Sequence, residues 1–390
     1  MQAEYPLSLW ERARACPVLR YGGEGENRPP KIDNPQLKID NCQLKIDPGG
    51  NTLKVGTRLA GNAPAEIAES ARRADRLGFD TTSSSETNHN PFLPLAIAAE
   101  HTESAELRTS IALAFARSPM DVAYLSWDLQ AMSGGRFVLG LGSQVRGHIV
   151  RRFSMNWTPP APRMREYIQA LRHIWNAWQT GERVQFHGDY YDFNLMPPFF
   201  NPGSIPNPDV KVYISAVNPY MLRVAGEVCD GVLLHGFCTP KYTREVIIPN
   251  LKIGADRAGR SLDEIEINAG GFIITGETEE EVESKKAGVK GQISFYASTR
   301  SYESVMSTHG WEDTAARLYR MSVDNRWPEM PNQITDDMLE TFAVVGTHDQ
   351  IVSKLKETHG DYATSISFDF PTSTPEDEER LAAMVAQLQT

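Results

Sequence analysis

Short apolar segments that read as β-strands alternate with amphipathic helices from Leu53 onward, and this alternation constrains the fold of the chain most. The strand segments lie at residues 53–59, 80–84, 107–116, 136–141, 211–217, 232–236, 264–276 and 363–370. Strands that are separated by helices predict a parallel sheet, because a parallel connection has to cross back over the sheet. Eight such units predict an α/β fold, a closed (β/α)8 TIM-like barrel with insertions.

An open doubly wound sheet is the alternative arrangement. Such a sheet usually carries a glycine-rich phosphate-binding turn after its first strand, but the sequence at 56–62 is GTRLAGN. The stretch Gly134–Arg152 has Gly140 and Gly142 after a strand, yet Val145 stands at the third glycine position of the dinucleotide motif. We therefore favour the barrel, on which these glycines form either a nucleotide-associated turn or an ordinary strand-to-loop turn.

Two helices begin with a capping residue followed by proline, at Ser118–Pro119 and at Asn218–Pro219. The inner face of the first of these helices is predicted to consist of Val122, Leu125, Leu129 and Met132. Residues 300–340 are less periodic and are predicted to form an insertion.

The first 51 residues differ from the rest of the chain. A seven-residue unit repeats over residues 31–47 (KIDNPQL KIDNCQL KID). Two and a half copies are too few for a coiled coil, and Pro35 interrupts the first copy. We expect residues 1–51 to be a poorly ordered, disordered N-terminal extension, and residues 52–390 to form the barrel domain.

The composition excludes several classes of function. A net charge of −11 argues against a nucleic-acid partner. The four cysteines have no C-x-x-C spacing and no H-E-x-x-H motif is present, so neither disulfides nor a metal site are predicted. No apolar run is long enough for a membrane span and no secretory signal is visible, so we expect a cytoplasmic protein without a membrane partner.

In a barrel of this kind the active site lies at the C-terminal ends of the strands. Glu86 and His89 follow the second strand, and His235 follows the sixth. These residue types can exchange protons with a reacting group, so they are the candidate catalytic residues. Each histidine could instead be an ordinary loop residue that is hydrogen-bonded to the backbone.

Two further strand ends suggest a cofactor site. The loop after the fourth strand contains Ser143, Gln144 and His148. The fifth strand leads through Ser215–Asn218 into a helix, and the free N–H groups at the start of a helix suit a phosphate. The alternative for this segment is an ordinary strand-to-helix turn with a good cap.

Four segments together resemble the bacterial luciferase-like superfamily, and most of all its branch of oxidoreductases that use the deazaflavin coenzyme F-420. These segments are TNHNPFLPLAIAAEHT (87–102), IALAFARSPMDVAYLSWDLQAMSGGRFVLGLGSQV (111–145), AVNPYMLRVAGEVCDGVLLHG (216–236) and FAVVGTHDQIVSKL (342–355). The likeness extends from Leu53 to about Pro371, and its motifs are specific in combination.

The resemblance implies a flavin or deazaflavin at the C-terminal mouth of the barrel. It implies that Glu86 is the acidic residue at the end of the second strand, although Thr87 stands where some relatives carry histidine. It also implies a homodimer. The residues that it assigns to the cofactor are a strained peptide bulge at Ser110 and Ile111, the loop residues Ser143, Gln144 and His148, and the phosphate-binding amides of Ser215, Ala216, Val217 and Asn218.

The predicted function is a deazaflavin-dependent oxidoreductase that transfers a hydride between coenzyme F-420 and a small-molecule organic substrate. The alternative is an FMN-dependent luciferase-like monooxygenase on the same barrel. A third possibility is a non-catalytic barrel that only binds a cofactor.

Overall fold

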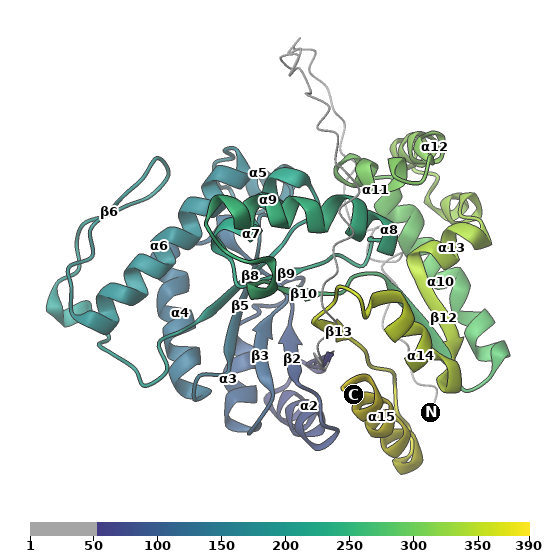
Figure 1. Ribbon diagram of the computed structural model, residues 1–390, viewed down its shortest axis with the longest axis horizontal. Helices are drawn as coiled ribbons and strands as arrows, with labels where there is room; N and C mark the ends of the chain where they lie inside the picture. The colour runs from purple at the N-terminus through teal and green to yellow at the C-terminus, as the bar shows by residue number, and fades with distance from the viewer. Residues whose placement is uncertain (1–52) are drawn as a thin grey trace, which may run out of the picture. The chain divides into compact units, whose positions relative to one another are not determined.

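The computed structural model describes residues 53–390 (Figure 1). The predicted extension, residues 1–51, lies outside the described residues. Eight parallel strands form a closed barrel, because β3 pairs with β5 through Leu107 and Phe137 and thereby joins the two ends of the sheet. The predicted (β/α)8 barrel is therefore confirmed. Its strands are β1 (Lys54–Arg58), β2 (Thr81–Ser84), β3 (Glu106–Thr109), β5 (Phe137–Gly142), β8 (Lys211–Ser215), β9 (Gly231–Leu233), β10 (Glu266–Asn268) and β13 (Ser365–Ser367).

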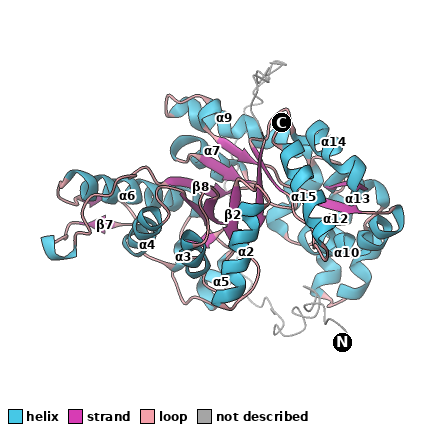
Figure 2. Ribbon diagram, turned by 90° about the horizontal axis from the view of Figure 1, so that it is seen from below, coloured by secondary structure: helices cyan, strands magenta, loops and turns pink. Residues whose placement is uncertain are grey.

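Helices surround these strands (Figure 2). None of the helices within residues 53–390 combines the length and the apolar character that crossing a membrane would require. The helices are α2 (Pro64–Arg76), α3 (Leu93–Glu100), α4 (Pro119–Met132), α5 (Arg146–Arg151), α6 (Pro160–Thr180), α7 (Pro219–Val228), α8 (Pro240–Tyr242), α9 (Ile248–Arg257), α10 (Glu279–Ala297), α11 (Glu303–Ser307), α12 (Glu312–Val323), α13 (Asp336–Phe342), α14 (His348–His359) and α15 (Pro375–Leu388).

Helix α4 begins as predicted, and of its predicted inner face Val122 and Leu129 are buried and Leu125 packs against the core. The Oγ of Ser118 accepts a hydrogen bond from the backbone N–H of Met120, at 3.2 Å. Met132, however, is 57% exposed, so its predicted inward position is wrong. Helix α6 also packs on α4: the ring of Trp127 in α4 lies against that of Trp178 in α6, with centroids 5.9 Å apart.

The segment 264–276 forms two strands rather than one. Strand β10 belongs to the barrel, whereas β11 (Phe272–Gly276) leaves it and pairs in parallel with β12 (Ala343–Thr347), which the sequence did not predict. Two more short strands, β6 (Phe186–His187) and β7 (Asp192–Phe193), form a separate hairpin, and β4 (Ala112–Leu113) pairs with β5. In Figure 1, β12 lies beside α10 and α13, away from the barrel strands.

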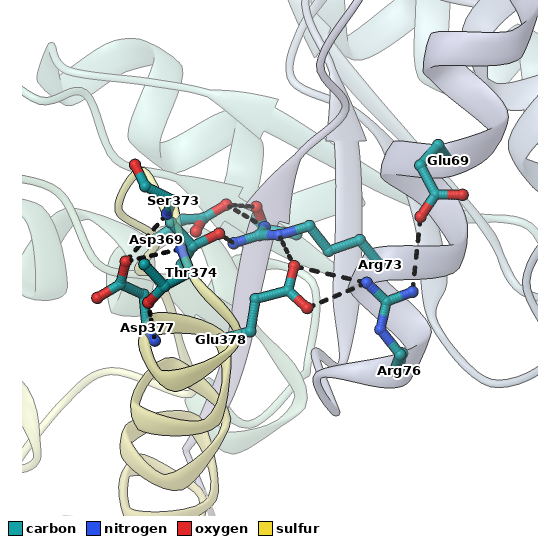
Figure 3. A network of polar contacts seen from close by, with 10 residues as sticks. Glu69, Arg73, Arg76, Asp369, Ser373, Thr374, Asp377 and Glu378 are labelled. Atoms are coloured by element: carbon teal, nitrogen blue, oxygen red, sulfur yellow. Dashed lines mark hydrogen bonds and ion pairs between the residues drawn. The ribbon is translucent and has the colours of Figure 1, made fainter.

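Side chains of the last strand–helix unit hold it against the first one (Figure 3). Arg73 of α2 contacts Asp369, which follows β13, at 3.4 Å and Glu378 of α15 at 3.3 Å. Arg76 reaches the same Glu378 at 3.2 Å. Thr57 of β1 also donates a hydrogen bond to Asp369. These contacts supplement the pairing of β1 with β13, so both backbone and side chains close the barrel.

Four charged side chains meet at the N-terminal ends of alternate barrel strands, β1, β3, β8 and β10. The Nζ of Lys54 lies 3.1 Å from Glu266 and 3.3 Å from Glu106, and the Nζ of Lys211 lies 2.8 Å from Glu266. Burial alone would raise the pKa of Glu266, but the hydrogen bond from Lys211 and the charge of Lys54 outweigh it and lower the pKa to about 2.

We expect the substitution Glu266→Gln to destabilise the protein at pH 7 by about 3 kcal/mol. The folded protein holds the pKa of Glu266 below its ordinary value of 4.5, so this stabilisation is complete above pH 4.5 and is lost as the pH falls toward 2. Urea unfolding of both proteins at pH 7 and at pH 3 measures the effect. A difference in unfolding free energy that stays constant between the two pH values would contradict the assignment.

Candidate functional site

The predicted site residues follow five strands that are neighbours in the barrel: β2, β3, β5, β8 and β9. Because the strands are parallel, their carboxyl ends meet at one mouth of the barrel. The register supports this: Leu113 lies opposite Gly142, and Ser215 lies opposite Leu233. The structure therefore brings the ends of these five strands together.

The third strand is interrupted at the predicted position. Strand β3 ends at Thr109, the peptide bond between Ser110 and Ile111 is cis, and β4 begins at Ala112. The expectation of one continuous strand over 107–116 is therefore wrong. The chain does depart from regular strand geometry at Ser110–Ile111, where the family resemblance implied a bulge. The Ile111 side chain packs on a small cluster inside the barrel that consists of Val138, Tyr213 and Leu233.

The glycines after the fourth strand make room for this interruption. A Cβ atom on Gly140 would lie 1.9 Å from the backbone oxygen of Thr109, and one on Gly142 would lie 2.5 Å from the Ile111 side chain. The Oγ1 of Thr109 also accepts from Gly140 N–H at 2.9 Å and donates to its carbonyl at 2.8 Å. These glycines therefore permit close packing of β5 on the third strand.

Glu86 is paired rather than free. Its carboxylate accepts two hydrogen bonds from the Arg117 guanidinium, at 2.7 and 2.9 Å, and a third from the N–H of Leu113, at 2.8 Å. Its backbone N–H donates to the Ile111 carbonyl at 3.3 Å. The side chains of Glu86 and Arg117 are 7% and 15% exposed. This buried pair holds the segment after Ile111, and a catalytic role for Glu86 stays a prediction.

The two histidines predicted on the loops, His89 and His148, are exposed at the rim. Partial desolvation of the His148 ring, followed by the charges of Arg152 and Arg151, lowers its pKa although the residue is largely accessible to solvent. The Nη2 of Arg152 donates to the Thr87 carbonyl at 2.9 Å, so α5 and the loop that carries His89 are in contact. Catalytic and cofactor roles for these histidines stay predictions.

Gln144 adopts a left-handed backbone conformation, with φ +56°, directly after β5. This conformation is uncommon for a residue other than glycine. The Oε1 of Gln144 accepts from the N–H of Val145 at 2.9 Å, and Ser143 and Gln144 are both half-buried. The chain therefore turns sharply at the position that the resemblance assigns to the cofactor.

Helix α7 begins at the predicted phosphate-binding turn, but Asn218 does not cap it. Its side chain makes no capping hydrogen bond and instead donates from Nδ2 to the Ser301 carbonyl, at 3.3 Å. The predicted side-chain cap is therefore absent, although Asn218 still occupies the N-cap position and its carbonyl accepts from the Leu222 N–H at 3.1 Å. The Oη of Tyr242 donates to the Val217 carbonyl at 3.0 Å and lies 2.9 Å from the Oγ of Ser304.

His235 lies two residues beyond β9 in an aromatic environment. Its ring centroid is 4.5 Å from that of Tyr296 and 4.9 Å from that of Tyr302. The backbone N–H of Phe237 donates to the Nδ1 of His235 at 2.9 Å. Burial lowers the pKa of His235 to about 4, so the ring is neutral near pH 7.

Several residues around these strand ends escaped the sequence reasoning. Arg117 could have been inferred, because a buried carboxylate needs a cationic partner. Tyr242, Tyr296 and Tyr302 carry no comparable signal, because they come from helices and turns that are remote in sequence. A cavity of about 520 Å³ lies elsewhere, lined by β12 and by residues of α10 and α14, and none of the predicted site residues lines it.

Comparison with known proteins shows to which family the chain belongs. Residues 47–365 match the luciferase-like monooxygenase family. An uncharacterized protein of Mycobacterium tuberculosis is 44% identical over 302 residues, which are 77% of this chain and 89% of the relative. The 5,10-methylenetetrahydromethanopterin reductase of Archaeoglobus fulgidus is 27% identical over 299 residues, covering 75% of this chain and 85% of the relative.

Solved structures share the fold. The coenzyme F-420 dependent tetrahydromethanopterin reductase of Methanopyrus kandleri has a TM-score of 0.69 at 23% identity, over 87% of this chain and 98% of that chain. The 3,6-diketocamphane monooxygenase of Pseudomonas putida, solved with FMN, has a TM-score of 0.58 at 16% identity, over 87% and 98%. The chain belongs to the luciferase-like monooxygenase family, whose members are oxidoreductases.

Proposed function

We propose that this chain is a coenzyme F-420-dependent oxidoreductase that transfers a hydride between the deazaflavin and a small organic substrate. The observation that carries the proposal is the start of α7. Its first-turn N–H groups receive no side-chain cap, and the Asn218 side chain donates to the Ser301 carbonyl. Uncapped amides at the positive end of a helix suit the phosphate of a cofactor. The sequence similarity to methylenetetrahydromethanopterin reductases supports the deazaflavin.

The charges near the mouth fit an anionic cofactor. Arg146, Arg151 and Arg152 lie in or next to α5, directly after β5. Within residues 53–390 none of the three forms a salt bridge, although the chain carries a net charge of −11. A local excess of positive charge in an acidic protein attracts a negatively charged ligand.

In the proposed reaction, bound deazaflavin supplies the two-electron hydride chemistry. The amides of Ser215–Asn218 and of the first turn of α7 would hold its phosphate. Ile111 would support the ring from inside the barrel, and the buried pair of Glu86 and Arg117 would hold the segment around Ile111. The exposed His89 is the candidate proton donor at the rim.

The proposal is tested by the choice of cofactor. We expect the protein to bind F-420 more tightly than FMN, and to oxidise or reduce F-420 with an organic substrate without consuming oxygen. Fluorescence titration of the two cofactors, followed by absorbance and oxygen-electrode measurements, checks this. Tighter binding of FMN with oxygen consumption would support the FMN-dependent monooxygenase instead, because solved family members include an FMN complex. Binding without turnover would support the non-catalytic barrel.

A further inference from the structure

His235 and the proposed phosphate site lie on adjacent strands. Strands β8 and β9 pair up to Ser215 and Leu233, so Val217 and His235 each lie two residues beyond the last pair. Neighbouring strands are about 4.8 Å apart. The backbones of Val217 and His235 are therefore neighbours at the mouth of the barrel, next to the start of α7.

The hydrogen bond from Phe237 determines which nitrogen of His235 carries the proton. A backbone N–H can only donate, so Nδ1 is the acceptor and the neutral ring carries its proton on Nε2. Nε2 makes no hydrogen bond to any residue of the part of the chain described, 53–390. It is thus an available donor in a largely buried ring.

Residues 301–304 connect this ring to the phosphate turn. The Ser301 carbonyl accepts from Asn218, and the Ser304 hydroxyl contacts Tyr242, which in turn binds the Val217 carbonyl. Between them, Tyr302 packs on His235 at 4.9 Å. One short segment of the predicted insertion therefore contacts both the turn and the histidine.

We propose that the Nε2–H of His235 donates a hydrogen bond to the phosphate group of the cofactor, and that Tyr302 is a positioning residue for the ring. The inference rests on the proposed function, since it requires a phosphorylated cofactor at Ser215–Asn218. It applies to FMN and F-420 alike, because both carry a phosphate. It predicts that His235 contributes to recognising the phosphate rather than the redox ring.

The test compares FMN with riboflavin, which differ only in the phosphate, and F-420 with its deazariboflavin chromophore, which lacks the phosphate and the side chain attached to it. Dissociation constants are measured for the full chain and for two variants. His235→Asn keeps an acceptor for the Phe237 N–H but removes the donor at Nε2, whereas His235→Gln places an amide donor near Nε2. We expect the Asn variant to lower the preference for the phosphorylated ligand about tenfold, and the Gln variant to keep most of it.

The proposal would be overturned if His235→Asn kept the wild-type preference for the phosphorylated ligand, which includes the case in which it weakens the binding of both ligands of a pair equally. Tyr302→Phe should preserve the preference and Tyr302→Ala should reduce it, while circular dichroism shows that each variant is folded.

Nitrogen-15 NMR of the unliganded full chain should find His235 protonated at Nε2, and protonation at Nδ1 would contradict the inference without involving any cofactor. If the wild-type chain binds none of the four ligands, the proposed function itself fails.

Discussion

The substitution Gly140→Ala is expected to destabilise the protein by about 3 kcal/mol or more. The new methyl group would lie 1.9 Å from the Thr109 carbonyl oxygen and 3.0 Å from Leu233. The first of these atoms belongs to the backbone, so β5 would have to move away from β3 and the two hydrogen bonds between Gly140 and Thr109 would break. Urea unfolding of the variant and of the wild type measures the loss.

The control for this substitution is Gly288→Ala. Gly288 lies on an exposed face of α10, and a Cβ atom there would meet nothing within 4 Å. Because alanine favours helix more than glycine does, this variant is expected to gain about 0.5–1 kcal/mol. If Gly140→Ala were as stable as the wild type, β3 and β5 would not pack as closely as described at Gly140. The conclusion that glycines in β5 make room for the Ser110–Ile111 segment would then also be wrong.

The second large effect is expected for Glu86→Ala. Removing the carboxylate leaves Arg117 buried without its partner and the Leu113 N–H without its acceptor. Breaking a buried pair in this way costs about 3–5 kcal/mol. Glu86→Gln is expected to lose less than Glu86→Ala, because its one oxygen can still accept from the Leu113 N–H and from one Arg117 nitrogen, although the charge of Arg117 stays without a partner. Thermal and urea unfolding of the two variants measure the difference.

An exposed pair of similar geometry serves as the control. Arg326 contacts Glu329 through two hydrogen bonds, at 3.0 and 2.6 Å, but both side chains are more than half exposed. Glu329→Ala is therefore expected to change the stability little, because water replaces the lost contacts. A stable Glu86→Ala variant with intact cofactor binding would remove the structural role assigned to Glu86 and would leave only its predicted catalytic role to be tested.

The sequence predicted the features that depend on neighbouring residues. The order of strands and helices, the barrel and the cap at Ser118 follow from periodicity and from the preferences of single residues. The position of the Ser110–Ile111 segment came from the family resemblance rather than from any local pattern. The split of residues 264–276 was missed because both halves are apolar, and an apolar run does not show which sheet each half joins.

The tertiary structure decided how distant residues are combined. Met132 at the end of α4 is exposed, and the Asn218 side chain donates to Ser301 without capping the helix that Asn218 begins. The need for glycine at position 140 appears only when Thr109 lies against it, and Glu86 is a paired carboxylate only because Arg117 reaches it. Local propensity acts within a few residues and can be read from the chain, whereas these contacts join segments that only the closed barrel brings together.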